Sequence, residues 1–195
     1  KTFLKKLDIP GKSFEGYLFP NTYQFTENEL PFDIINRMVG EFKKNFSDEM
    51  YEQMKKVEMT EIEVLTLASI IEGEAIYDRE RPTISGVYHN RLKRGMRLQA
   101  DPTIQYIIDD SPRRLLNKDL KIESPYNTYL HNGLPPGPIN NPGLESIKAA
   151  LYPEKNDYLY FVARGDGYHT FSKTQEQHNK AKRDFQKVRR NLRKQ

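Results

Sequence analysis

The sequence predicts an α+β domain that is mostly helical, with one small antiparallel β-sheet and one long structured loop. Apolar residues recur at helical spacing over much of residues 31–108, whereas Tyr158–Ala163 is the clearest strand. Residues 109–143 are rich in loop signals, and a loop longer than ~15 residues inside a compact domain usually has a function. At 195 residues, one domain or one domain with a small appendage is expected.

The first 26 residues differ in texture from the rest. They contain two prolines, two glycines and several aromatic residues, which is typical of short extended segments joined by turns. We therefore divide the chain into an N-terminal segment of residues 1–26 and a main domain of residues 27–195. The main domain is expected to end in a basic amphipathic helix.

Three helices are predicted in succession after this segment. Pro31 is placed to begin the first, whose apolar residues keep a 3.6-residue period as far as Phe46. Ser47 is a suitable N-cap for the second. Thr60 and Glu63 fit a capping box, which opens a third helix that runs to about residue 75.

The elements beyond residue 75 follow from similar signals. A fourth helix is expected from about Arg79 to Arg94, and Gly95 ends it as a C′ glycine. After a short extended piece, Asp101 is predicted to be the N-cap of a short helix with Pro102 in its first turn. We also expect a helix over 144–152, a hairpin of strands 158–163 and 168–172, and a last helix from about residue 173.

Charge and composition limit the classes of function. The net charge is +4, yet residues 180–195 hold eight Lys or Arg and one Asp, so the rest of the chain is slightly acidic. This distribution argues against a nucleic-acid binder and favours a surface helix with a solvated basic side, with contact to anionic lipid or wall polymer as the alternative.

Cysteine is absent, which excludes disulfides and thiolate metal sites. No apolar stretch approaches the ~20 residues of a membrane span, and the chain opens on Lys1, so we interpret it as a fragment without its targeting segment.

Glu72 is the first candidate for catalysis. It follows the uncharged apolar run 65–71 of the third helix, and hydrocarbon surroundings disfavour the ionised form of a carboxyl group. A protonated carboxyl can donate its proton to a leaving oxygen, which is the role of the acid in glycosidases. The hypothesis is a sugar-polymer-cleaving enzyme with Glu72 as its acid; the alternative is a structural Glu72 paired with Arg79 or Arg91. Glu74 lies roughly 200° further round the helix and does not share this face.

Two further segments carry groups suited to sugars. Residues 99–103 and the loop 126–129 bring together amides, hydroxyls and phenols, which hydrogen-bond sugar hydroxyls and pack on pyranose rings. The Pro-rich run 133–138 is stiff and would suit the wall of a cleft, although turn geometry alone also explains it. The four histidines are scattered without metal-ligand spacing, so neither a metal nor a cofactor is expected.

Several blocks of this sequence resemble a known family. The chain is similar, in the same order and over roughly residues 14–180, to the endolytic murein transglycosylases of the MltG (YceG-like) family. The blocks that carry the resemblance are Glu15–Tyr23, Ala68–Glu72, Asn90–Leu92, Gly95–Thr103, Tyr126–Tyr129, Gly133–Ile139 and Tyr158–Val162.

The resemblance implies a lysozyme-like, lytic-transglycosylase-type domain that cleaves peptidoglycan glycan strands internally, between N-acetylmuramic acid and N-acetylglucosamine. The family's catalytic glutamate, placed in the Ala-Ser-Ile-(Ile/Val)-Glu block, would be Glu72, acting first as acid and then as base to give a 1,6-anhydro end. Many members have Lys where this chain has Gly73, which leaves the role of Glu74 open. The residues expected to bind substrate are Glu74, Asn90, Gln99, Asp101, Tyr126, Asn127, Thr128 and Tyr129.

The resemblance also implies a cellular setting. Family members have one N-terminal transmembrane helix, with the enzyme on the extracytoplasmic face of the cell membrane, and a LysM-like region before the catalytic part. Residues 1–26 would then be a junction with that region, and residues 27–195 the catalytic domain. Glycan strands are the expected partner, and peptidoglycan synthases are candidate partners. The competing functions are a peptidoglycan hydrolase of the spore-cortex-lytic type, a non-catalytic wall-binding module and, more remotely, a nucleic-acid binder.

Overall fold

The central helix of the molecule is α4 (Glu61–Glu74), and its sequence explains both its start and its position. The predicted capping box is present: the Thr60 hydroxyl accepts the Glu63 amide at 3.4 Å, and the Glu63 carboxylate accepts the Thr60 amide at 2.8 Å. Every residue from Val64 to Ile71 is buried, so this part of the helix has no solvent face and forms the middle of the core.

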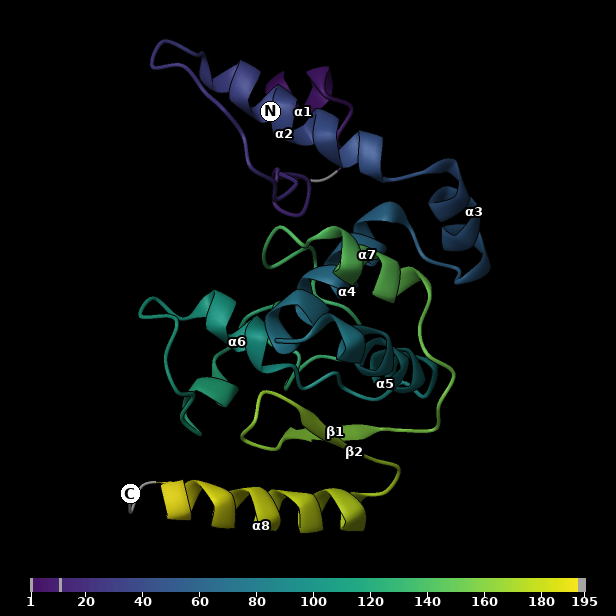
Figure 1. Cartoon of the computed structure of the whole chain (residues 1–195), viewed down its shortest axis with the longest axis vertical. Helices are drawn as coiled ribbons and strands as arrows, with labels where there is room; N and C mark the ends of the chain where they lie inside the picture. The colour runs from purple at the N-terminus through teal and green to yellow at the C-terminus, as the bar shows by residue number, and fades with distance from the viewer. Residues whose placement is uncertain (1, 11, 193–195) are drawn as a thin grey trace.

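The other elements surround α4 from one end of the molecule to the other (Figure 1). The computed structural model describes residues 2–10 and 12–192. Helices α1 and α2 lie at one end and the hairpin with α8 at the other, while α5, α6 and α7 lie beside α4. Their bounds are α1 Thr2–Lys6, α2 Pro31–Asn45, α3 Asp48–Lys56, η1 Asp78–Glu80, α5 Arg81–Lys93, α6 Asp101–Ile107, η2 Asp119–Lys121, α7 Leu144–Leu151, β1 Tyr160–Ala163, β2 His169–Ser172 and α8 Gln175–Leu192.

These elements confirm the predicted α+β class. In the described part of the chain one sheet pairs β1 and β2 antiparallel, with Tyr160 opposite Ser172 and Ala163 opposite His169. The predicted helix starts at Pro31 and after Ser47 are also confirmed, and the Ser47 hydroxyl accepts the Met50 amide. Gly95 has φ +64°, as a C′ glycine requires.

The N-terminal segment differs from the prediction. Thr2–Lys6 forms a short helix, where short extended segments joined by turns were predicted, and its Phe3 ring packs edge-on against Phe32 of α2 with the ring centroids 4.9 Å apart. Leu7 is buried, and its carbonyl accepts a hydrogen bond from Lys43 at 2.8 Å. A five-residue helix has no periodic signal of its own, so these tertiary contacts decide its conformation.

The long loop is held against α4 by side chains of that helix and of the loop itself. The Ser69 hydroxyl accepts the Ile139 amide at 3.0 Å, and the Asn140 side chain donates to the Ser69 carbonyl at 2.8 Å. Asn141 accepts the amides of Gly16 and Leu18, which joins the N-terminal segment to the same loop. The loop is therefore ordered around one end of α4, where the candidate site lies.

No helix among the described residues combines the length and the apolar character that a passage through a membrane requires.

Candidate active site

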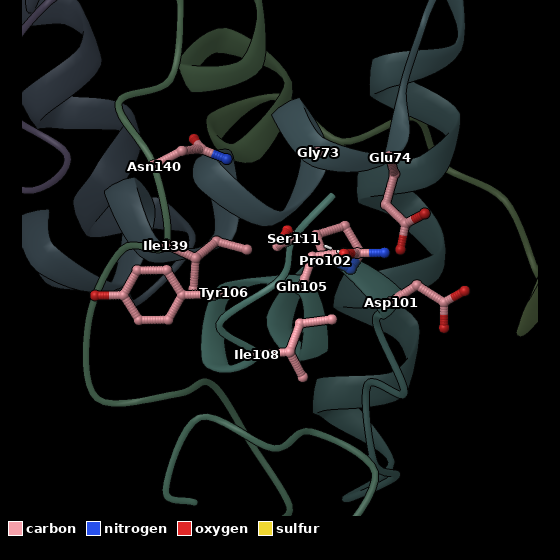
Figure 2. A pocket seen from close by; sticks show the side chains of 10 residues that line it. All are labelled: Gly73, Glu74, Asp101, Pro102, Gln105, Tyr106, Ile108, Ser111, Ile139 and Asn140. Atoms are coloured by element: carbon pink, nitrogen blue, oxygen red, sulfur yellow. Dashed lines mark hydrogen bonds between the residues drawn. The ribbon is translucent and has the colours of Figure 1, made fainter. Parts of the chain in front are cut away.

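Two clefts meet beside the last turn of α4. The first has a volume of about 570 Å³ and the second about 520 Å³, and Glu74 and Asp101 line both. Figure 2 shows the first cleft, with Glu74 from α4 and Asp101 from α6 at one end and the Tyr106 ring at the opposite end. A chain-like ligand that crosses from one cleft to the other would pass these two carboxyl groups.

Glu74 has the environment of a general acid. Burial raises its pKa from 4.5 to about 7, the hydrogen bond from Tyr88 opposes this rise, the charge of Asp101 adds to it and that of Arg91 reduces it. The Tyr88 hydroxyl donates to Glu74 Oε1 at 2.7 Å, which fixes the orientation of the carboxyl group. Glu74 is therefore protonated in part near neutral pH and lies where a substrate could reach it.

The absence of a side chain at position 73 brings α6 close to α4. A Cβ atom added to Gly73 would lie 2.6 Å from Pro102 Cβ and 2.8 Å from Pro102 Cγ. Such distances are too short for carbon atoms in contact, so only glycine lets Pro102 lie against the end of α4 in this arrangement. This contact holds the first turn of α6, which carries Asp101, against the last turn of α4, which carries Glu74.

Asp101 is held by a neighbouring phenol. The prediction that Asp101 is an N-cap is wrong: Ala100 occupies that position without a side-chain cap, and Asp101 is the first residue of α6. Its carboxylate instead accepts a hydrogen bond from the Tyr129 hydroxyl. Burial and the charge of Asp101 together raise the pKa of Tyr129, which keeps this phenol protonated as a donor. Gln99, at φ +49°, lines the second cleft beside Asp101 and Tyr129.

The second cleft continues toward β1 and α8. Arg91 of α5 lies in its wall and is only 6% exposed, and its guanidinium donates to the carbonyls of Leu98 and Leu159 at 2.6 Å each. Arg91 also lies over the Tyr160 ring, 5.3 Å from its centroid. Arg91 thereby joins α5, the segment before α6 and the hairpin around one wall of the cleft.

Glu72 lies in a different environment from the one its sequence context predicts. Its Oε1 is 3.3 Å from Arg81 Nη2, and its Oε2 accepts the Gly143 amide at 3.0 Å. The side chain is 32% exposed, and Glu72 lines neither of the two clefts. The prediction that hydrocarbon surrounds this carboxylate is thus wrong, because the chain after η1 places the Arg81 side chain beside it. The ion-pair partner of Glu72 is Arg81 rather than Arg79 or Arg91.

The structure brings together only some of the predicted substrate-binding residues. Glu74, Gln99, Asp101 and Tyr129 line the second cleft. Asn90 lies elsewhere, because its side chain donates to the carbonyls of Asn156 and Tyr158 and joins α5 to the segment before β1.

The loop 126–129 mainly supports the site from behind. Asn127 is fully buried and donates to the carbonyls of Leu120 and Ile122, while its own oxygen accepts the Tyr129 amide at 2.9 Å. Thr128 is also buried, and its hydroxyl accepts the Ala100 amide at 3.0 Å. Tyr126 packs against Tyr106 with ring centroids 4.9 Å apart.

Several residues of the site carry no strong sequence signal. Tyr88 and Arg91 both belong to α5. From the sequence alone, Tyr88 is expected to be a core residue and Arg91 a surface residue. Arg91 stands in the Asn90–Leu92 block, and from the sequence it was named only as a possible partner of Glu72. The other residues of the clefts that the sequence did not indicate include Gln105, Tyr106, Asn140, Tyr160, His169 and His178. Among the residues that the structure describes, no cluster of three or more His, Asp or Glu side chains could hold a metal ion.

Comparisons with known proteins give one consistent result. The sequence model of the YceG-like family matches residues 1–184. An endolytic murein transglycosylase of Bacillus subtilis (strain 168) is 46% identical over 172 residues, which are 88% of this chain and 48% of that protein. A protein of the same description from Streptococcus pneumoniae serotype 2 (strain D39 / NCTC 7466) is 37% identical over 172 residues, 85% of this chain and 31% of that protein.

A solved structure has the same fold. The crystal structure of a yceG-like protein from Listeria monocytogenes superposes with a TM-score of 0.83 at 43% sequence identity, covering 92% of this chain and 62% of that one. The chain thus spans half or less of the length of these curated relatives and about three fifths of the crystallised one.

Proposed function

The chain belongs to the YceG-like family, and from this we propose that it is the catalytic part of an endolytic murein transglycosylase. The substrate would be the glycan strand of peptidoglycan, cut internally between N-acetylmuramic acid and N-acetylglucosamine. The observation that best supports a catalytic role is the Glu74 carboxyl group, whose pKa is raised to about 7 where two clefts meet.

In the proposed reaction Glu74 acts twice. Its protonated carboxyl donates to the glycosidic oxygen while the bond from that oxygen to C1 of the muramyl residue breaks, and C1 gains oxocarbenium character. The resulting carboxylate then takes the proton from the muramyl 6-hydroxyl as its oxygen bonds to C1. The products are a 1,6-anhydro-muramyl end and a new N-acetylglucosamine end, and Glu74 regains its proton. No water enters the reaction, so a second carboxyl group at the spacing of a hydrolase is not required.

The surrounding residues would prepare this proton transfer. Tyr88 orients the Glu74 carboxyl through its 2.7 Å hydrogen bond, and Asp101, held by Tyr129, places negative charge next to the cleft. Such charge favours the protonated form of Glu74 before reaction and an oxocarbenium-like sugar during it. Gln99 and the exposed edge of Tyr129 are candidates for hydrogen bonds to the sugars.

Glu72 would serve this site as a positioning residue rather than as the acid. Its bonds to Arg81 and the Gly143 amide tie the end of α4 to α5 and to the start of α7. The sequence-based assignment of Glu72 as the acid remains the competing hypothesis, and paired substitutions of the two glutamates separate the two assignments.

Analysis of the products tests the proposed activity. Isolated sacculi incubated with the protein should release fragments that end in 1,6-anhydro-muramyl residues, 18 mass units below their hydrated counterparts as expected for loss of water. Reducing ends in their place would support the hydrolase of the spore-cortex-lytic type. If no fragment is released while the protein still binds sacculi, a non-catalytic wall-binding module would be the better description.

The pKa of Glu74 predicts the pH dependence of cleavage. The acid form is required, so the rate should fall as pH rises through about 7. Asp101→Asn removes a charge that raises the pKa of Glu74, and should therefore shift this alkaline limb to lower pH. The measurement is kcat/KM on soluble glycan strands between about pH 5 and pH 9, at intervals of about half a pH unit. An unchanged limb in the variant would mean that another group controls the rate.

The setting of the whole protein is a further part of the proposal. Peptidoglycan lies outside the bacterial cell membrane, so we expect action at the extracytoplasmic face, through the anchor that the family resemblance implies, and contact with peptidoglycan synthases. Membrane fractionation of the full-length protein, and protease accessibility of this domain in spheroplasts, would check the location. Protection of the domain from added protease until the spheroplasts are lysed would contradict this location.

A further inference from the structure

One wall of the second cleft is formed by α8, and this wall is polar and cationic. Gln175, His178, Lys182 and Phe185 follow one another at helical spacing, so they share one face of α8, and all four line the cleft. The acidic groups of the cleft, by contrast, come from α4 and α6. The helix that the sequence predicted to be a surface helix with a solvated basic side therefore turns one of its sides to the same cleft as Glu74.

Lys182 carries a charge that no carboxylate of the described residues neutralises. Lys173 pairs with Asp157 at 2.9 Å and Lys187 with Asp184 at 3.3 Å, whereas Lys182 is exposed and makes no ion pair within the described part of the chain. A free ammonium group in the wall of a cleft is available for an anionic ligand.

A second polar group lies beside it. The His178 ring stacks on Tyr160 with centroids 5.2 Å apart, and Arg91 lies over the same Tyr160 ring. His178 Nδ1 is buried without a hydrogen-bond partner among the described residues. Burial, and then the charges of Lys182 and Arg91, lower the pKa of His178. Lys182 and Arg91 both line the cleft near this ring.

Sugar rings carry no anionic group that could neutralise these cations. In a peptidoglycan strand the negative charges are carboxylates on the substituent of the muramyl residue, either the lactyl group itself or the peptide attached to it. We propose that the α8 wall of the second cleft is a subsite for such a carboxylate, with Lys182 as its main cationic group and His178 as a neutral partner. The inference rests on the proposed function and narrows its substrate to muramyl residues whose substituent is acidic.

The experiment compares three kinds of glycan strand. One carries its peptides, one has been stripped to the lactyl carboxylate, and one has every carboxylate blocked as a methylamide. For the unaltered protein, kcat/KM on one or both charged strands should exceed that on the blocked strand roughly threefold to tenfold, as for one partly screened ion pair. In the peptide-bearing strand the lactyl carboxyl is an amide without charge, so a preference for the stripped strand alone assigns the ligand to the lactyl carboxylate. A preference for the peptide-bearing strand alone assigns it to a carboxylate of the peptide, and a preference for both shows that the subsite accepts either carboxylate.

Lys182→Gln should remove most of this preference. Lys187→Gln is the matched control, because it removes the same charge from the same helix at a position that does not line the second cleft. Equal cleavage of all three strands by the unaltered protein would overturn the proposal. The same applies if Lys182→Gln lowers cleavage of all strands alike, or if both lysine variants lose the preference equally, since each result indicates a general effect of charge or stability.

Binding separates this proposal from the proposed function. Calorimetric titration of the three strands into the Glu74→Gln variant measures carboxylate preference without cleavage. A preference in binding with no cleavage by the unaltered protein would support the subsite and reject the enzyme. Cleavage without any preference in binding would reject the subsite and leave the enzyme.

Discussion

Glu74→Gln is expected to reduce cleavage of isolated sacculi by a factor on the order of 10²–10⁴, the usual contribution of a general acid. The amide has nearly the same shape, and its oxygen can still accept the Tyr88 hydroxyl, so the fold should be preserved. What the variant lacks is a proton that can be given to the glycosidic oxygen. Release of anhydro-muramyl fragments, followed over time by mass spectrometry, is the measurement.

Glu72→Gln is the matched control, two residues away on the same helix. It weakens the pairing with Arg81 but keeps an oxygen for the Gly143 amide, so we expect a modest loss of stability, about 1 kcal/mol, and cleavage within about tenfold of the unaltered protein. The opposite pattern, with Glu72→Gln inactive and folded and Glu74→Gln active, would make Glu72 the acid.

The same pair of variants should differ in how stability depends on pH. Because the pKa of Glu74 in the folded state lies near 7, above its ordinary value of 4.5, the folded protein binds more protons than the unfolded chain between these values. The free energy of unfolding should therefore fall as pH rises across this range. In Glu74→Gln this part of the slope should disappear, whereas Glu72→Gln should retain it; urea unfolding at pH 5 and pH 8 gives the comparison.

The largest loss of stability is expected from Arg91→Met. The guanidinium is buried, and its removal leaves the carbonyls of Leu98 and Leu159 without this donor. An unsatisfied buried polar group costs about 1–3 kcal/mol, so the free energy of unfolding should fall by about 3 kcal/mol or more. The loss of the positive charge should also raise the pKa of Glu74 further.

Arg94→Met is the control for this change. Arg94 is an exposed residue at the C-terminal end of the same helix, and such substitutions usually alter stability by less than about 0.5 kcal/mol. Urea unfolding followed by circular dichroism measures both variants. Equal losses of unfolding free energy in Arg91→Met and Arg94→Met would show that the loss comes from a general effect on the helix rather than from the buried hydrogen bonds of Arg91.

The fold was largely predictable because its signals are local. The capping box at Thr60, the cap at Ser47 and the C′ glycine at position 95 each follow from chemistry within one turn of chain. The helix at Thr2–Lys6 was missed because contacts with residues far along the chain, such as that of Phe3 with Phe32 of α2, stabilise it.

The site was predictable only in part, because its character comes from groups far apart in the chain. The sequence pattern placed the candidate acid in the last turn of α4, beside which the two clefts meet, and it ranked the two glutamates of this turn by the hydrocarbon that precedes them. Which carboxyl is desolvated depends on Tyr88, on Arg81 and on the approach of α6, none of which the helical pattern reveals. Likewise, the amides and hydroxyls of Asn127 and Thr128 are suitable for sugars by type, but both are occupied by neighbouring backbone groups.

The contact between Gly73 and Pro102 has a consequence for variation among related enzymes. Any larger residue at position 73 must displace Pro102, and Asp101 is the adjoining residue, so it would move as well. The electrostatic coupling between the two carboxyl groups would then weaken, and the proton affinity of Glu74 would decline with it. The size of the residue at position 73, which itself lines the first cleft, can thus change the proton affinity of the neighbouring carboxyl group.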